Sequence, residues 1–252
     1  MSRPEFVQSL ERGLSVIRSF DAENARLTLA EVAQRTGLTR ATARRLLLTL
    51  EDLGYVSSNG RHFSLTPRVL DIGYAYLSSL NIQQIAQPFL EALSERVNES
   101  VSVTVLDGAD IIYVARVPTK RIMTISLGLG SRLPAYCTSM GRVLLAELTP
   151  AELAAIVPER LEPRTAHTIA SRAELEDVLA DIRRQGWALV DEELEVGLRS
   201  LAAPLRDASG RAVAAMNVST NAGRTTTDEI HEHVLPAVLA AARDIGDALA
   251  KR

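Results

Sequence analysis

Hydrophobic positions recur every three or four residues along the first 53 residues, which predicts helices that each bury one face. A first amphipathic helix with one buried stripe is predicted by the spacing of Phe6, Leu10, Leu14, Ile17 and Phe20. Two further helices are predicted over residues 29–36 and 40–53, and two short strands over 55–58 and 61–65. The segment therefore predicts a small helical unit that ends in a hairpin.

The start and stop signals within this segment have a definite order. Thr28 and Glu31 have the spacing of a capping box, and Gly37 can end that helix in the left-handed conformation. Thr39 is the next N-cap, so two helices are joined by a turn of about three residues that contains glycine, as in a helix-turn-helix. The Asn59-Gly60 pair favours a type I′ hairpin, and we interpret that hairpin as a wing.

The second helix of this pair is basic. Residues 1–66 carry nine arginines and seven acidic residues, whereas the rest of the chain carries 19 basic and 24 acidic residues. Residues 37–50 contain three arginines and no acid, and arginine binds guanine or phosphate. Three solvated arginines alone would not indicate DNA binding. The capping box, the glycine turn and the hairpin signal that occur in order around them favour it. The candidate DNA-binding residues are Thr39, Arg40, Ala41, Thr42, Arg44 and Arg45 on the helix, with Arg61 and His62 at the wing tip.

The remaining pattern predicts a linker helix and a mixed domain. Pro67 can open a helix that runs to Asn81, and the apolar residues on more than one side of it favour a dimer contact. After a helix over 82–97, strands are predicted at 101–106, 111–117, 122–127, 187–190, 198–205 and 212–219, with helices at 139–148, 150–156, 172–185 and 227–251. Strands in runs with helices between them predict an α+β fold with a mainly antiparallel sheet. We therefore expect domains at 1–66 and 82–252, joined by a linker at 67–81.

One helix start differs from the others. The predicted helices that begin at Thr28, Thr149, Ser171 and Thr226 each have a glutamate three residues later, whereas the helix near Thr138 and Ser139 has no acid until Glu147. Its free amides could accept an anion, with Arg132 a few residues upstream. The alternative is that Thr138 or Ser139 simply caps its own backbone.

Composition excludes several classes of protein. The chain has 252 residues, 46% of them hydrophobic, and a net charge of −3, which gives no global attraction to nucleic acid. A single cysteine, Cys137, excludes a disulfide within the chain and a zinc site of paired thiolates. The first residues do not resemble a signal peptide, and the longest uncharged stretch, residues 72–90, is too polar to span a membrane. We expect a cytoplasmic protein with no cofactor and no membrane contact.

Catalytic and metal motifs are incomplete. The run from Cys137 through Ser139 to Gly141 resembles part of a nucleophile elbow, but the first glycine is missing and no histidine is marked as a base. Gly128 and Gly130 begin a dinucleotide fingerprint that Leu133 interrupts, and His231 and His233 point in different directions on one helix. We predict no enzyme and no metal site; a cysteine hydrolase that uses Cys137 is a remote alternative.

Long motifs resemble the isocitrate-lyase-regulator (IclR) family of bacterial transcription factors over nearly the whole chain. They lie at residues 29–33, 41–47, 133–142 and 192–204. Residues 123–125, 134–146 and 186–191 further resemble the PcaR/PcaU/PobR branch, which regulates the β-ketoadipate pathway of protocatechuate and 4-hydroxybenzoate catabolism. The resemblance implies a winged helix-turn-helix joined to a GAF-like effector-binding domain, in a homodimer or tetramer bound to double-stranded operator DNA.

The resemblance also implies where the effector binds. Family members hold it between the sheet and the helix start, which points to Thr138, Ser139, Met140, Ser200, Asn217 and Ser219. Candidate partners for an effector carboxylate are Arg121, Arg132 and Arg199. Many relatives have Cys at the position of Ser200 and Asp at that of Val190, and the loss of that carboxylate favours an anionic ligand. The expected effectors are protocatechuate, 4-hydroxybenzoate, a carboxymuconate or β-ketoadipate; the alternative is a non-aromatic metabolite such as glyoxylate or a sugar acid.

Overall fold

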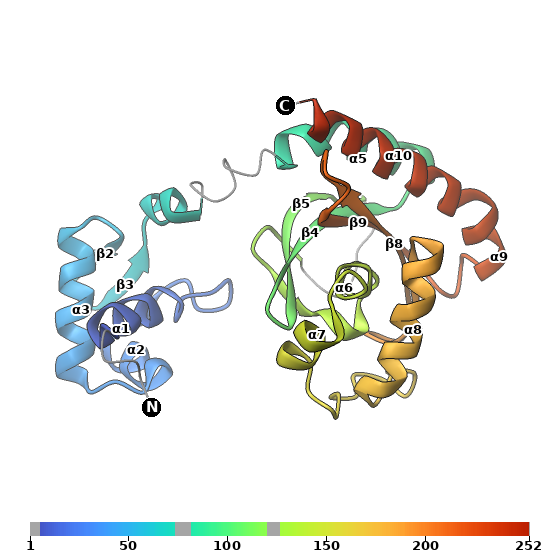
Figure 1. The fold of residues 1–252 in the computed structure, drawn as a ribbon. Helices are drawn as coiled ribbons and strands as arrows, with labels where there is room; N and C mark the ends of the chain where they lie inside the picture. The colour runs from blue at the N-terminus through green and yellow to red at the C-terminus, as the bar shows by residue number, and fades with distance from the viewer. Residues whose placement is uncertain (1–5, 74–81, 120–126, 252) are drawn as a thin grey trace. The chain divides into compact units, whose positions relative to one another are not determined.

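The structure is a computed structural model that describes residues 6–73, 82–119 and 127–251. The chain divides into two compact units, residues 1–79 and residues 80–252, and each is described by itself (Figure 1). The two units meet between residues 79 and 80, so this division does not test the linker boundaries expected at 66/67 and 81/82, which stay predictions.

The N-terminal unit packs three helices against a small sheet. The helices are α1 (Gln8–Ile17), α2 (Leu29–Thr36) and α3 (Arg40–Asp52). The strands β1 (Leu27–Thr28), β2 (Val56–Ser58) and β3 (His62–Leu65) form an antiparallel sheet in the order β1-β3-β2. Val16, Val32 and Leu47 are fully buried in the core between them. This arrangement confirms the winged helix-turn-helix.

The local signals that predicted the two central helices are present. Thr28 and Glu31 form the reciprocal capping box at the start of α2, and Gly37 ends that helix with φ +67°. The Thr39 hydroxyl accepts a hydrogen bond from the backbone N–H of Thr42 and so caps α3. Helix boundaries in this unit therefore follow from local chemistry.

The turn of the wing differs from the predicted type I′ turn. Ser58 pairs with Phe63, so the central residues of the turn are Gly60 and Arg61, and only Gly60 has a positive φ, of +87°. A positive φ at the first central position alone is the mark of a type II′ turn. The side chain of Asn59 accepts hydrogen bonds from the N–H groups of Arg61 and His62, which explains why asparagine precedes the glycine.

The apolar stripe of α1 is not buried as predicted. Phe6 is 52%, Leu10 63% and Leu14 46% exposed, whereas the core of the unit takes Val16 and Phe20. Three short helices offer too small an interior to cover both parts of the stripe. The periodicity therefore identified the apolar residues of the stripe correctly. It did not predict that part of this stripe would be exposed in the unit.

The segment expected to form the linker helix starts with a single 3₁₀ turn. The Thr66 hydroxyl accepts a hydrogen bond from the N–H of Arg68, and Pro67 occupies the first position of the 3₁₀-helix η1 (Pro67–Val69). Residues 70–73 continue as a helix, with Leu70 73% and Ile72 51% exposed. The rest of the predicted linker helix, from 74 to Asn81, lies outside the described residues.

The C-terminal unit is built on a six-stranded antiparallel sheet. Its strands are β4 (Ser100–Asp107), β5 (Asp110–Val117), β6 (Arg132–Pro134), β7 (Ala188–Asp191), β8 (Leu198–Arg206) and β9 (Ala212–Asn221), in the order β6-β5-β4-β9-β8-β7. Every described pair is antiparallel, which confirms the α+β prediction. Most of the strand predicted at 122–127 lies outside the described residues.

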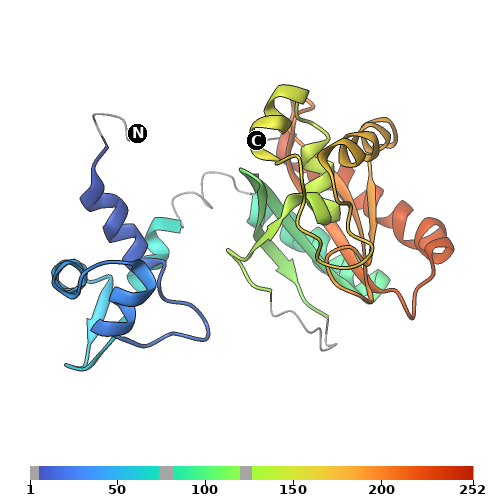
Figure 2. The same cartoon turned by 90° about the horizontal axis from the view of Figure 1, so that it is seen from below.

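Helices cover both faces of this sheet. Two long helices, α5 (Ile82–Val97) and α10 (Leu235–Ala250), pack together on one face. On the other face lie the short helix η2 (Ala135–Cys137), α6 (Ser139–Leu145), α7 (Pro150–Ile156) and α8 (Arg172–Gln185). Figures 1 and 2 show these two sets of helices on opposite sides of the sheet.

The C-terminal helix is not the continuous α-helix that periodicity predicted. It comprises α9 (Thr227–Glu229), a π-helical turn η3 (Ile230–Val234) and then α10. Pro236 stands in the first turn of α10. Its ring has no N–H to donate and crowds the preceding turn, so the regular hydrogen-bond ladder changes there.

Helix α6 is buried along its whole length. All seven of its residues, including Arg142, are buried, and it contacts β4, β7, β8 and β9. Gly141 makes this close approach possible, because a Cβ at that position would lie 2.2 Å from the carbonyl oxygen and 2.3 Å from the Cα of Ala135. The helix can sit this near to the preceding turn only with glycine there.

We predict that Gly141→Ala destabilises the C-terminal unit by about 3 kcal/mol or more, because backbone must move to admit one methyl group. Thermal or urea unfolding followed by circular dichroism measures this. Gly13→Ala is the matched control: a Cβ there meets nothing within 4 Å, so we expect a gain of up to about 1 kcal/mol. Equal stability of Gly141→Ala and the wild type would contradict the packing argument.

Candidate functional site

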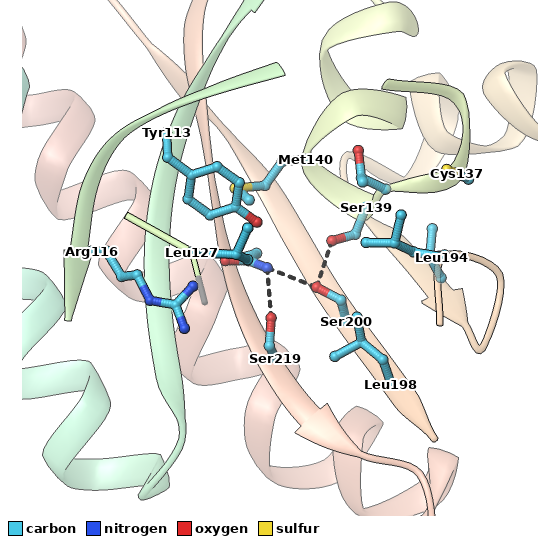
Figure 3. A pocket seen from close by; sticks show the side chains of 13 residues that line it. Tyr113, Arg116, Leu127, Cys137, Ser139, Met140, Leu194, Leu198, Ser200 and Ser219 are labelled. Carbon is cyan, nitrogen blue, oxygen red and sulfur yellow. Dashed lines mark hydrogen bonds between the residues drawn. The ribbon is translucent and has the colours of Figure 1, made fainter. Parts of the chain in front are cut away.

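A pocket opens in the C-terminal unit between the start of α6 and strands β5, β8 and β9 (Figure 3). The space free for a small molecule within it is about 30 Å³, inside a region of about 520 Å³ that also counts the gaps between atoms and the open solvent at its mouth. Its apolar walls are formed by Leu127, Met140, Val190, Leu194 and Leu198. Such a lining, with a few polar groups, is typical of a small-molecule site.

Three serines and one asparagine form a connected polar cluster inside the pocket. The side-chain Nδ2 of Asn217 donates to the hydroxyls of Ser200, at 2.8 Å, and Ser219, at 2.9 Å. The hydroxyls of Ser139 and Ser200 lie 2.8 Å apart, which links the sheet to α6 (Figure 3). The Asn217 Oδ1 is buried and accepts no hydrogen bond from any residue that the structure describes. A buried acceptor without a partner is costly, so it marks a place for a donor.

Tyr113 and Arg116 enter the pocket together because of a β-bulge. On β4, Ser102 pairs with Arg116 and Thr104 pairs with Tyr113, and Val114 is the extra residue between them. Residues three apart on a regular strand would face opposite sides of the sheet. The bulge brings both side chains to the pocket face. Burial raises the pKa of Tyr113 to about 12, although the nearby charge of Arg116 acts in the opposite direction, so the phenol is neutral at pH 7.

Arg116 differs from the arginines that the sequence singled out. Among the described residues, it makes no ion pair, and it is the only charged residue lining the pocket. Arg132 instead lies on the edge strand β6, where its guanidinium binds Asp107 at 2.6 Å and Asp110 at 3.2 Å. Neither Arg132 nor the acids that pair with it line the pocket.

Arg199 also lies outside the pocket lining. Its guanidinium forms two hydrogen bonds, of 2.8 and 2.7 Å, with the carboxylate of Asp191, its cross-strand neighbour, and a third with the carbonyl of Thr225. Its charge is therefore satisfied within the fold. Arg121 lies outside the described residues.

The start of α6 is capped by its own chain. The Thr138 hydroxyl accepts a hydrogen bond from the N–H of Gly141 at 3.2 Å, which is the alternative that the sequence left open. The residues at the helix start therefore contribute side chains to the pocket. Because this N–H group is bonded within the chain, the helix dipole is no separate argument for an anion site.

A buried ion pair holds one wall of the pocket in place. Arg142, with 3% of its side chain exposed, binds the carboxylate of Glu193 at 2.5 Å and donates to the carbonyl of Tyr136 at 2.8 Å. The Glu193 carboxylate also accepts from the N–H of Ile169. Because Leu194 follows Glu193 directly, this pair anchors the loop that supplies an apolar wall. Neither Arg142 nor Glu193 lines the pocket itself.

The structure brings together six residues that the sequence assigned to the effector site. They are Thr138, Ser139, Met140, Ser200, Asn217 and Ser219. Sequence reasoning missed Tyr113 and Arg116. Their spacing of three on a strand gives no sign of a shared face, because the bulge at Val114 is a property of pairing with β4.

Cys137 does not have the surroundings of a catalytic nucleophile. It is fully buried, and burial raises the pKa of its thiol to about 11, so the thiolate is scarce at neutral pH. Within the described parts of the chain, no group of three or more His, Cys, Asp or Glu side chains could hold a metal ion. The geometry therefore favours binding over catalysis.

The candidate nucleic-acid surface lies on the N-terminal unit. Arg40, Arg44 and Arg45 are exposed on α3, and none of them forms an ion pair with a described residue. Thr39 and Ala41 are exposed beside them, Thr42 is half-buried, and Arg61 is exposed in the turn of the wing. His62 is half-buried and pairs with Thr28, so it lies beside the start of α2 and not at the tip of the wing.

Comparisons with known proteins agree with this division of the chain. Residues 9–60 match the family described as the IclR helix-turn-helix domain, and residues 74–247 match the bacterial transcriptional regulator IclR C-terminal family. The chain belongs to the IclR family of bacterial transcriptional regulators. Membership in this family confirms the sequence-based identification of a DNA-binding regulator with a small-molecule effector, and not an enzyme.

Several IclR-family proteins are similar over almost the whole chain. The Pca regulon regulatory protein of Pseudomonas putida is 46% identical over 96% of this chain and 84% of its own length. The p-hydroxybenzoate hydroxylase transcriptional activator of Acinetobacter baylyi is 34% identical over 96% and 91%. A crystal structure from a Rhodococcus species, described as a transcriptional regulator, has 54% identity, a TM-score of 0.86 and coverage of 98% and 99%.

None of the helices in the described ranges is both long enough and apolar enough to cross a membrane.

We predict that Cys137 resists alkylation by iodoacetamide at pH 7.5 in the folded protein and reacts after unfolding, because burial excludes the reagent and suppresses the thiolate. Mass spectrometry of the labelled protein measures this. Since the folded pKa is raised to about 11, labelling should increase as pH rises toward that value while the fold persists. Rapid labelling of the native protein at pH 7.5 would restore the nucleophile hypothesis.

Proposed function

We propose that this protein regulates transcription of genes for aromatic-acid catabolism in the β-ketoadipate pathway, under the control of a small carboxylic acid bound in the pocket. The observation that carries the proposal is Arg116, which forms no ion pair with any described residue and is the only charged residue among the described residues that line a largely apolar pocket. A carboxylate on an apolar body matches such a lining. The names of the Pseudomonas and Acinetobacter relatives support the choice of pathway.

DNA binding is assigned to α3 and the wing. In this proposal a homodimer places its two copies of α3 in major grooves about one helical turn, ~34 Å, apart on a palindromic operator. Phe6, just before α1, and Leu10 and Leu14 within it are exposed apolar residues, as are Leu70 and Ile72 of the expected linker, and they support a second copy as partner. The effector then acts to the extent that it binds two arrangements of the dimer with different affinity.

We expect one or more of four acids to shift the binding of the purified protein to DNA from beside its own gene. The acids are protocatechuate, 4-hydroxybenzoate, a carboxymuconate and β-ketoadipate, and fluorescence anisotropy at fixed salt measures the shift. Glyoxylate and a sugar acid serve as the comparison set. A response to these alone would replace the aromatic pathway by the non-aromatic alternative, and no response to any acid would remove the effector assignment.

Arg45→Ala should weaken operator binding by about 1 to 3 kcal/mol if Arg45 contacts a guanine. If it contacts a phosphate, the salt dependence of log K should instead decrease by about one. Anisotropy titrations at several salt concentrations separate the two outcomes. Arg243→Ala is the matched control, because Arg243 is exposed on α10 in the other unit. Unchanged affinity and salt dependence in Arg45→Ala would place Arg45 outside the DNA contact.

A further inference from the structure

We propose that Tyr55 and Arg68 are positioning residues for DNA binding. Their contact joins the start of the linker to the end of α3, so that the two move as one rigid piece, and neither side chain needs to touch DNA. The inference rests on the homodimer of the proposed function, because the joint matters only where two copies of α3 bind DNA together.

The chain is fixed in position where α3 ends. Gly54 has a φ of +81°, and its N–H donates to the carbonyl of Glu51 at 2.9 Å. The N–H of Tyr55 donates to the carbonyl of Leu50 at 2.8 Å, which completes the Schellman pattern at a helix end. Val56 follows as a buried residue at the start of β2. The backbone of Tyr55 is therefore held between the last turn of α3 and the core of the unit.

The start of the linker is bonded to this same turn. The N–H of Thr66 donates to the carbonyl of Tyr55 at 2.9 Å, and its hydroxyl donates to the carbonyl of Gly54 at 2.5 Å. The same hydroxyl accepts a hydrogen bond from the N–H of Arg68 at 3.3 Å, so it also caps η1. The ring of Pro67 then restricts φ, so the chain leaves the turn in a defined direction.

The side chain of Arg68 lies across the joint. Its guanidinium carbon is 5.4 Å from the centre of the Tyr55 ring, which is within the range of a cation–π contact. A Cβ on Gly54 would lie 3.1 Å from Nη1 and 3.5 Å from Cδ of Arg68, so the side chain also lies against the backbone of the turn. Arg68 forms no ion pair with any residue that the structure describes. The contact with Tyr55 thus adds a side-chain link to the backbone hydrogen bonds of the joint.

The joint connects two surfaces with different tasks. The candidate DNA contacts begin at Arg40 on α3, whereas the exposed Leu70 and Ile72, directly after η1, belong to the surface proposed to bind a second copy. If the joint is rigid, the dimer contact also sets the direction of each α3. The second α3 is then presented to its half-site at a high effective concentration, which a flexible joint would lower. Binding to one half-site does not depend on the joint.

The test is fluorescence anisotropy of the full-length protein on two DNA duplexes. The first is the operator located by footprinting in the DNA beside its own gene, and the second is the same duplex with one half-site scrambled. The wild type should bind the complete operator at least about 100-fold more tightly than the single half-site. Tyr55→Leu and Arg68→Gln should each reduce this ratio at least about fivefold and leave affinity for the single half-site within about twofold of the wild type.

Matched variants separate the joint from the loss of a charge or of stability. The double variant should have the same ratio as either single variant, because both remove one shared contact. Tyr55→Phe keeps the ring and should keep the wild-type ratio. Arg35→Gln is the control for charge, because Arg35 is an arginine of the same unit that pairs with Asp21 and not with the turn, and it should leave the ratio unchanged. Thermal unfolding by circular dichroism checks each fold, and the exposed Arg68→Gln decides the question even if Tyr55→Leu does not fold.

The possible failures are distinguishable. If Arg68→Gln weakens binding to both duplexes equally and lowers the salt dependence of log K by about one, Arg68 binds a phosphate and the inference is overturned. If neither variant changes the ratio, the joint does not position α3, and the inference is overturned while the proposed function stands. If the wild type gains no affinity from the second half-site, the homodimer of the proposed function itself fails.

Discussion

The close packing of α6 against the turn before it determines the interior of the C-terminal unit. Gly141 lets the helix approach Ala135 so nearly that the whole helix is buried, and this burial takes Arg142 out of water. A buried guanidinium requires a partner, and Glu193 supplies it. The same carboxylate binds the N–H of Ile169, so three segments far apart in sequence meet at one ion pair. The positions of Ser139 and Leu194 at the pocket follow from this arrangement.

Most of the nearby arginines form ion pairs outside the pocket, and this determines the electrostatic potential inside it. Arg132, Arg142, Arg199 and Arg206 all bind carboxylates within the unit, so their fields are largely cancelled. Arg116 has no such partner among the described residues and faces a lining without acids. Among the described residues, Arg116 therefore contributes most to the field inside the pocket, although the protein as a whole carries a net charge of −3.

The sequence predicted well much of what is decided locally, although the turn of the wing is type II′ and not the expected type I′. The capping box at Thr28 and the left-handed Gly37 depend on a few neighbouring residues, and both were correct. Features that depend on distant partners were missed. Arg132 and Arg199 were plausible ligands for an anion until the fold placed Asp107 and Asp191 beside them. The polar cluster of the site was found through family resemblance, because serines on a strand carry no local signal of function.

The bulge at Val114 has a further consequence, for how this pocket can change during evolution. Without Val114, Tyr113 and Arg116 would stand two residues apart on a regular strand and would still share a face, because their partners Thr104 and Ser102 are themselves two residues apart. The bulge therefore absorbs a change of one residue in the length of β5 without turning either side chain away from the pocket. In an alignment of related regulators, a gap of one residue opposite Val114 would thus leave the pocket residues on both sides of it in register.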